Sequence, residues 1–312
     1  MIYKVLTLFP EVISPYLESS ILGRAQEKGL IQVELCQIRD FAVNTYGKVD
    51  DLLYGGGTGM LMMAEPIWQA WCHCRGLDPD NPDLAVSAAK MSVLNAAKTS
   101  ALSADEATAL NATKSPAPGA AKATSLQVDE RLKLNQSDTQ SGEEVKSLTL
   151  FMSPRGLVYD QDLALTFSKY DELIIICGNY EGVDDRIIDK VGALEVSMGD
   201  YVLTGGELGA LTVIDTVSRL IPGVFTSDEV WQEESHASGL LAEPQYTRPA
   251  DWRGLQVPEV LLSGHEAKIQ RWRYLSALNT TLERRPDMFA KVKLTTEVWK
   301  ELLEFRSRLA ED

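Results

Sequence analysis

Cysteine is scarce in this chain, which holds only Cys36, Cys72, Cys74 and Cys177 in 312 residues. No run of about 18 apolar residues occurs, which argues against a membrane-spanning helix. The first nine residues are too short and too alternating for a signal peptide, and they predict a strand. Without an export signal, we expect a cytoplasmic protein with reduced thiols rather than a disulfide framework. Cys72-His73-Cys74 lacks the second ligand pair of a zinc site, so we expect no metal site.

Basic residues are also few, with 30 Lys and Arg against 45 Asp and Glu and a net charge of −15. That balance argues against a nucleic-acid partner, because phosphate contacts need clustered cations. The charge is unevenly spread, however: Gly264 to Lys293 contains seven basic residues and three acids, a local charge of +4. This segment is either a solvated helix face or a surface for a polyanion.

The nucleotide-binding fingerprints GxGxxG and GxxxxGK[ST] are both missing, which lowers the case for an oxidoreductase or a nucleotidase. What is present is an alternation of strands and helices, typical of an α/β domain with a parallel sheet. We expect strands near 2–9, 31–36, 148–152, 173–177 and 193–198, with helices near 10–28, 64–75, 160–169, 184–190 and from 207 to before Pro222.

The domain boundaries follow from changes in composition. We expect an α/β domain over 1–224, a flexible linker over 225–250 and a small all-helical domain over 251–312, which carries the basic segment. Residues of about 76–147 are rich in Ala, Ser and Thr and nearly free of aromatics, so they predict a low-complexity insertion rather than a domain.

Two glycine-bearing loops directly follow apolar strands, Gly178 to Gly182 and Met198 to Gly206. In open parallel sheets, ligands bind beyond the carboxyl ends of the strands. Glycines there expose backbone N–H and C=O groups to a flat ring. These loops are either ordinary tight turns or a ligand site.

The order of the motifs resembles that of the bacterial tRNA guanine-N1 methyltransferases, knotted SPOUT-class enzymes. The resemblance covers nearly the whole chain apart from the insertion. It is carried by Leu8-Phe9-Pro10-Glu11, Val49-Asp50-Asp51, Tyr54-Gly55-Gly56-Gly57, Gly59-Met60-Leu61-Met62, Ser153-Pro154, Tyr180-Glu181-Gly182, Gly199-Asp200-Tyr201-Val202-Leu203, Gly205-Gly206-Glu207, Ile221-Pro222-Gly223-Val224, Tyr246-Thr247-Arg248-Pro249 and Val260-Leu261-Leu262-Ser263-Gly264-His265.

The resemblance implies a deep trefoil knot in the α/β domain, a rare exception to chain-threading rules. It implies transfer of a methyl group from S-adenosyl-L-methionine to N1 of the guanine at tRNA position 37, by a homodimer with active sites at the subunit interface. The positions that match the cofactor loops are Pro154, Gly178, Tyr180, Glu181, Met198, Gly199, Tyr201, Leu203, Gly205 and Gly206.

Two catalytic roles are implied as well. Arg219 matches the arginine that stabilises charge on guanine O6, and Glu234 stands where the family has an aspartate as general base. A glutamate carboxylate sits one methylene further out, and Glu233 could take its place. Residues expected to contact the tRNA are Arg24, Asp50, Lys268, Arg271 and Arg273.

The sequence departs from the family pattern at a few further positions. Asn179 replaces a basic residue, Thr58 a proline, Leu52-Leu53 an Arg-Pro pair, and His236 an aromatic residue. Two alternatives therefore stay open: a catalytically impaired RNA-binding homologue, and a methyltransferase of the same class with a different RNA target.

Overall fold

A computed structural model describes residues 1–81, 145–225 and 234–309 of the chain. It divides into two compact units, Met1–Val224 and Phe225–Asp312. Most of the insertion expected over about 76–147 lies outside the described residues, as does Glu233. No helix in the described ranges has both the length and the apolar character that crossing a bilayer requires.

The first unit is built on a five-stranded sheet in the order β2-β1-β6-β5-β7. Every neighbouring pair in this sheet is parallel. Its strands are β1 (Ile2–Thr7), β2 (Gln32–Gln37), β5 (Ser147–Val158), β6 (Glu172–Cys177) and β7 (Leu194–Ser197). The expected α/β class with a parallel sheet is confirmed.

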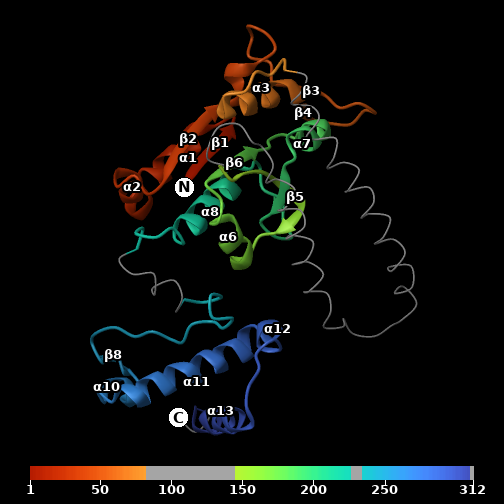
Figure 1. Cartoon of the computed structure of the whole chain (residues 1–312). Coiled ribbons are helices and arrows are strands. Elements are labelled where there is room, and N and C mark those ends of the chain that lie inside the picture. Colours follow the sequence, from red (N-terminus) through yellow and green to blue (C-terminus); the bar gives the residue numbers. More distant parts are fainter. Residues whose placement is uncertain (82–144, 226–233, 310–312) are drawn as a thin grey trace, which may run out of the picture. The chain divides into compact units, whose positions relative to one another are not determined.

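Helices cover both faces of the sheet, as Figure 1 shows. One face packs against α1 (Pro10–Leu17), α2 (Ser20–Glu27), α6 (Gln161–Phe167) and α8 (Glu207–Ser218). The other packs against η1 (Ile38–Phe41), α3 (Ala64–Arg75) and α7 (Asp185–Val191). Alternate residues of β6 enter the two cores, with Ile175 on the first face and Ile174 and Ile176 on the second. That alternation is why the strand is an unbroken apolar run.

Three features differ from the sequence expectation. The single helix expected over 10–28 is two helices, α1 and α2, and Ser20 at the start of α2 has a φ of 51°. A two-stranded antiparallel hairpin, β3 (Asp50–Leu52) and β4 (Met60–Met62), was not expected. Strand β5 continues to Val158, with a register shift between Met152 and Leu157 that sets the residues between them out of the ladder.

The second unit is mostly helical. Its helices are α10 (Glu259–Leu262), α11 (Glu266–Arg284), α12 (Pro286–Phe289) and α13 (Thr296–Leu309). A short hairpin of β8 (Asp251–Trp252) and β9 (Leu255–Gln256) precedes them, so an all-helical description is not complete. Its core joins Leu278 of α11 to Leu302 of α13.

Part of the segment expected to be a linker packs on α11. Leu240 is buried in the core of the second unit, and the backbone N–H of Leu241 donates to Thr281 Oγ1 at 2.9 Å.

Candidate functional site

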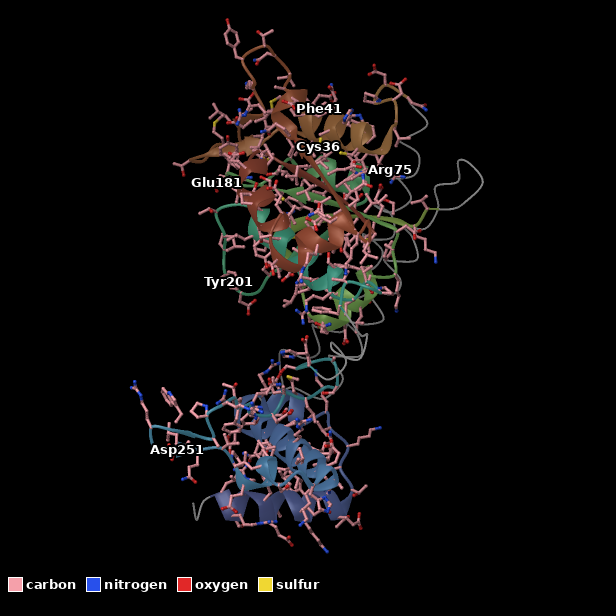
Figure 2. The ribbon with its side chains drawn as sticks, turned by 90° about the vertical axis from the view of Figure 1, so that its left-hand side faces the viewer. Cys36, Phe41, Arg75, Glu181, Tyr201 and Asp251 are labelled. Atoms are coloured by element: carbon pink, nitrogen blue, oxygen red, sulfur yellow. The ribbon has the colours of Figure 1, made fainter. Side chains whose placement is uncertain are left out.

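A cavity of about 530 Å³ opens in the first unit beyond the carboxyl ends of β6 and β7 and beside residues 151–155 of β5. Three loops line it: 153–155 within β5, 178–183 after β6, and 196–206 around and after the end of β7. Figure 2 shows Glu181 of the second loop and Tyr201 of the third on the same side of the unit. The cavity is therefore formed at the sheet edge where ligands of open parallel sheets bind.

Glycines bring backbone close to backbone at the base of this cavity. A Cβ at Gly206 would lie 2.7 Å from Cys177 Cα, and one at Gly178 would lie 3.0 Å from the ring of Phe151. The Gly206 N–H donates to the Gly178 carbonyl at 2.8 Å, which joins the second and third loops. Side chains at these positions would fill or distort the space in which a ligand must lie.

A buried carboxylate fixes the same two loops. Glu207, 5% exposed at the start of α8, accepts hydrogen bonds at Oε1 from Thr7 Oγ1 at 2.7 Å and from Asn179 Nδ2 at 2.9 Å. A bridge between Asn179 and Gly205 continues this contact along the backbone. Because both donors are satisfied by one acid, Glu207 holds the loops without itself lining the cavity.

The β3–β4 hairpin contacts the second loop. The Met62 N–H donates to the Gly182 carbonyl at 3.0 Å, and the Glu181 N–H donates to the Met60 carbonyl at 3.1 Å. Gly59 has a φ of +106°, and a Cβ there would lie 2.6 Å from Glu181 Cγ. The glycine segment before β4 therefore lies against a carboxylate that lines the cavity.

Charged side chains lie on another side of the cavity. Arg155 Nη2 is 2.6 Å from Asp185 Oδ1 and 3.3 Å from Glu195 Oε2. The carboxylates raise the pKa of Arg155, chiefly through the hydrogen bond to Asp185. Both Arg155 and Asp185 are largely exposed and line the cavity, so they can exchange this ion pair for charged groups of a ligand.

The structure brings together nearly all of the residues expected at a cofactor. Gly199 is the exception, since it does not line the cavity. Its φ of +135° places it in a turn, and a Cβ built there would lie 2.9 Å from the Tyr201 ring. The residues that do line the cavity are Pro154, Gly178, Tyr180, Glu181, Met198, Tyr201, Leu203, Gly205 and Gly206.

Arg219 does not line this cavity. It is half-buried at the carboxyl-terminal cap of α8, whose amino-terminal cap is Gly206. A helix rises about 1.5 Å per residue, so the 12 residues of α8 put roughly 18 Å between its ends. That separation exceeds the reach of an arginine side chain.

Glu234 is exposed and belongs to the second unit, whereas Arg219 belongs to the first. The neighbouring Ser235 accepts a hydrogen bond at Oγ from the Ala242 N–H at 2.8 Å. This bond folds the chain beside Glu234 back on itself.

The residues expected to contact tRNA lie on both units. Arg24 is exposed on α2, and Asp50 begins β3 opposite Met62. Lys268, Arg271 and Arg273 all lie on α11. Arg271 Nε donates to Glu301 at 2.7 Å, and Arg273 Nε is 3.6 Å from Glu243. These two side chains are 39% and 46% exposed, so part of each remains accessible to phosphate.

Sequence reasoning missed several residues of the site. Arg155 and Asp185 were not among the expected residues, although Arg155 directly follows Pro154 and Asp185 begins a helix near a glycine loop. Glu207 was expected only as part of a motif. Its place directly after two glycines was the available signal, but its burial against Thr7, 200 residues away, cannot be read from local sequence. Among the described residues, no three His, Cys, Asp or Glu side chains gather as a metal site would need.

The chain is similar in sequence to one family of enzymes. The family model described as tRNA (Guanine-1)-methyltransferase TrmD matches residues 1–114 and 129–291. A relative from Ruminiclostridium cellulolyticum is 40% identical over 292 residues, which cover 94% of this chain and 97% of the relative. One from Clostridium perfringens strain SM101 is 39% identical, over 94% and 95% of the two chains. One from Caldicellulosiruptor saccharolyticus is 39% identical, over 98% and 97%.

All three relatives bear the name tRNA (guanine-N(1)-)-methyltransferase. The model match extends through both units, and the matched relatives are covered almost end to end. The chain belongs to the tRNA (guanine-1)-methyltransferase family.

Proposed function

We propose that this enzyme transfers a methyl group from S-adenosyl-L-methionine to N1 of guanine 37 in tRNA, next to the anticodon. Methylation of guanine N1 in tRNA follows from family membership. The choice of donor rests on one observation above all: nine of the ten residues expected at the cofactor line a single cavity at the carboxyl edge of the sheet.

The residues around the cavity fit this donor. S-adenosyl-L-methionine combines a flat adenine, a ribose and a charged amino acid, and about 530 Å³ is within the range of small-ligand sites. Bare backbone at Gly178, Gly205 and Gly206 suits the adenine. Glu181 can accept hydrogen bonds from ribose hydroxyls, and Arg155 with Asp185 can pair with the carboxylate and the ammonium of the amino acid.

The chemistry asks little of the protein beyond position and charge. When bound, the donor supplies an electrophilic methyl group on a sulfonium. The protein must then align guanine N1 in line with that methyl, accept the N1 proton and stabilise the charge on O6. Glu234 is the proposed base, with Glu233 as its alternative, and Arg219 is the proposed partner of O6.

We further infer that the enzyme acts as a homodimer with each active site shared between subunits. Arg219 lies at the far end of α8 from the cavity of its own chain, roughly 15 Å along the helix from Gly209, the last residue of α8 that lines the cavity. If Arg219 takes part in the reaction, it must therefore serve the cavity of a second copy.

The remaining features are inferred from family membership together with the described surfaces. We infer that the loops around the cavity form a deep trefoil knot and that the protein works in the cytoplasm. We expect α11 to contact tRNA phosphates through Lys268, Arg271 and Arg273, contacts that position the RNA rather than read its sequence.

One assay tests the reaction and its target together. The purified protein is incubated with methyl-labelled S-adenosyl-L-methionine and an unmodified tRNA carrying guanines at positions 36 and 37. We expect label transfer and a primer-extension stop at guanine 37, because a methyl group on N1 blocks base pairing. Label without a stop would indicate ribose methylation. Bound tRNA without label would indicate a catalytically impaired RNA-binding protein.

A further inference from the structure

Two of the four cysteines share a second pocket in the first unit, separate from the methyl-donor cavity. This pocket has a volume of about 230 Å³ and has no lining residue in common with the larger cavity. Cys36 comes from the end of β2 and Cys74 from the last turn of α3, and both side chains are half-buried. Figure 2 shows Cys36 close to Phe41, which lines the same pocket.

The two thiols contact each other, and the contact is asymmetric. The Cys74 thiol donates a hydrogen bond to the Cys36 sulfur, which lowers the pKa of Cys36 and raises that of Cys74. The charged or titratable neighbours are Glu34, Asp40 and His73 in the pocket and Lys4, whose Nζ donates to the Cys74 carbonyl at 2.6 Å. Cys36 is thus the thiol that ionises first, and Cys74 is held beside it.

The other two cysteines differ from this pair in exposure and in thiol reactivity. Cys72 and Cys177 are fully buried, and burial raises the pKa of each thiol. A buried thiol in apolar surroundings is inert toward oxidants in solution. Cys72 and Cys177 therefore serve as internal controls for the exposure and the reactivity of Cys36 and Cys74.

We propose that Cys36 and Cys74 form a reversible oxidation site whose co-substrate is a small hydroperoxide. The Cys36 thiolate attacks a peroxide oxygen, the O–O bond breaks, and Cys36 becomes a sulfenic acid while the departing oxygen leaves after protonation as an alcohol, or as water when the hydroperoxide is hydrogen peroxide. The Cys74 thiol, losing its proton, then attacks the Cys36 sulfur and releases the sulfenic oxygen as water. Two thiols are oxidised to one disulfide, and one hydroperoxide is reduced.

The disulfide would close a loop that carries part of the active site. Residues 37–73 include the β3–β4 hairpin and its glycine segment, whose Gly59 lies against Glu181 in the methyl-donor cavity. Both anchors are already fixed: Cys36 pairs with Leu6 in the sheet, and the Cys74 carbonyl accepts from Lys4. Oxidation would restrain this segment with little movement of either anchor, and a reductant would release it.

Peptide mapping of the full-length protein tests the site. The chain is treated with hydrogen peroxide and its intact mass is measured, after which free thiols are blocked with N-ethylmaleimide before trypsin digestion. We expect a monomer lighter by about 2 Da before blocking, with a cross-link between peptides 29–39 and 49–75 that dithiothreitol removes. Because peptide 49–75 holds both Cys72 and Cys74, the cross-link is mapped in a Cys72→Ala variant, where it should persist.

Single substitutions distinguish the roles of the two thiols. We expect Cys36→Ser to lose the remaining thiols at least about ten-fold more slowly than the wild type. Cys74→Ser should lack the cross-link and accumulate a sulfenic acid on Cys36 that dimedone traps. A cross-link that persists in Cys74→Ser but disappears in Cys72→Ala would overturn the pairing. Disulfides formed only between chains, or over-oxidised Cys36 without a cross-link in the wild type, would overturn the site.

Discussion

Single atoms of the cavity decide whether a flat ligand can enter it. At Gly206 an added Cβ would meet backbone, Cys177 Cα at 2.7 Å, rather than the end of a side chain that could move aside. We expect Gly206→Ala to weaken binding of S-adenosyl-L-methionine at least about ten-fold and to cost about 1–3 kcal/mol of stability. Isothermal titration calorimetry and urea unfolding measure the two effects.

A control substitution at Gly76 distinguishes backbone strain from damage to the donor-binding cavity. Gly76 has a φ of +64°, and an added Cβ there meets nothing within 4 Å. Gly76→Ala should therefore cost stability, by about 1 kcal/mol, and leave donor affinity unchanged. Equal affinities for the donor in Gly206→Ala and the wild type would show that the backbone contact does not shape the binding site.

The buried acid Glu207 gives a second test at this scale. Glu207→Ala would leave the Thr7 hydroxyl and the Asn179 amide without their acceptor, so we expect a loss of about 2–4 kcal/mol in the free energy of unfolding. Glu207→Gln keeps an acceptor oxygen and should lose less. Urea denaturation measures both variants. A Glu207→Ala protein as stable as Glu207→Gln would contradict the role given to the shared oxygen.

Only some residues of the cavity could be predicted from the sequence. Residues inside recognisable motifs, such as Tyr180 and Leu203, could be assigned to the cavity from the motifs alone. Arg155 and Asp185 were missed because their ion pair joins a bulge in β5 to the start of α7, which lie 30 residues apart. Gly199 does not line the cavity, and a motif does not tell a glycine that lines a cavity from one that turns the chain.

Between elements, β5 and α8 are joined by a half-buried tyrosine. The Tyr159 hydroxyl, just after β5, is 2.6 Å from Thr216 Oγ1 on α8, and burial raises the pKa of Tyr159 to about 12. The folded state thus holds this proton more tightly than the unfolded chain, whose tyrosine pKa is 10.0. The contribution of the protonated Tyr159 to the free energy of unfolding is complete below pH 10 and is lost as the pH rises through about 12.

We expect this tyrosine to steepen alkaline unfolding. About two pKa units correspond to about 3 kcal/mol lost between pH 10 and 12. Tyr159→Phe should be less stable at neutral pH, by about 1 kcal/mol for the lost hydrogen bond, but its stability should fall less steeply over that range. Urea unfolding at several pH values measures the slopes. Parallel slopes for the two proteins would exclude Tyr159 as a contributor.

Elements with a strong period were predictable, and irregular ones were not. The unbroken apolar run of β6 and the apolar stripe of α3 each reflect burial, and both fall where the pattern placed them. The division of the helix over 10–28 at Ser20 leaves little trace in the pattern, because the apolar residues of α1 and α2 face the same core. The β3–β4 hairpin was missed because its strands have only three residues each.

At the scale of the whole molecule, the knot is inferred from family membership and the shared site from the length of α8. A knot cannot be read from periodicity, since strands and helices look the same whichever loop they pass through. A homodimer with shared sites is likewise invisible to composition, yet it follows if Arg219 is catalytic, because α8 places that residue far from the cavity on the same chain.

Mixing two impaired subunits tests this sharing, at a donor concentration too low to fill the Gly206→Ala cavity. Gly206→Ala impairs the cavity, and Arg219→Ala removes the guanidinium while leaving the cavity of its own chain intact. If Arg219 serves the second copy, each mixed dimer contains one intact site, formed by the cavity of the Arg219→Ala chain and the arginine of the Gly206→Ala chain. Random exchange makes half of the dimers mixed, so about a quarter of wild-type activity should return.

If Arg219 instead acted on its own chain, no mixed dimer would contain an intact site and activity would stay at the level of the separate variants. Exchange of subunits is verified with a mass-tagged chain, so that a failure to mix is not taken for a failure to complement. The same preparation should bind S-adenosyl-L-methionine at the cavities of the Arg219→Ala chains with wild-type affinity. Loss of that binding would place the arginine at the donor rather than at guanine O6, and it would remove the reason for a shared site.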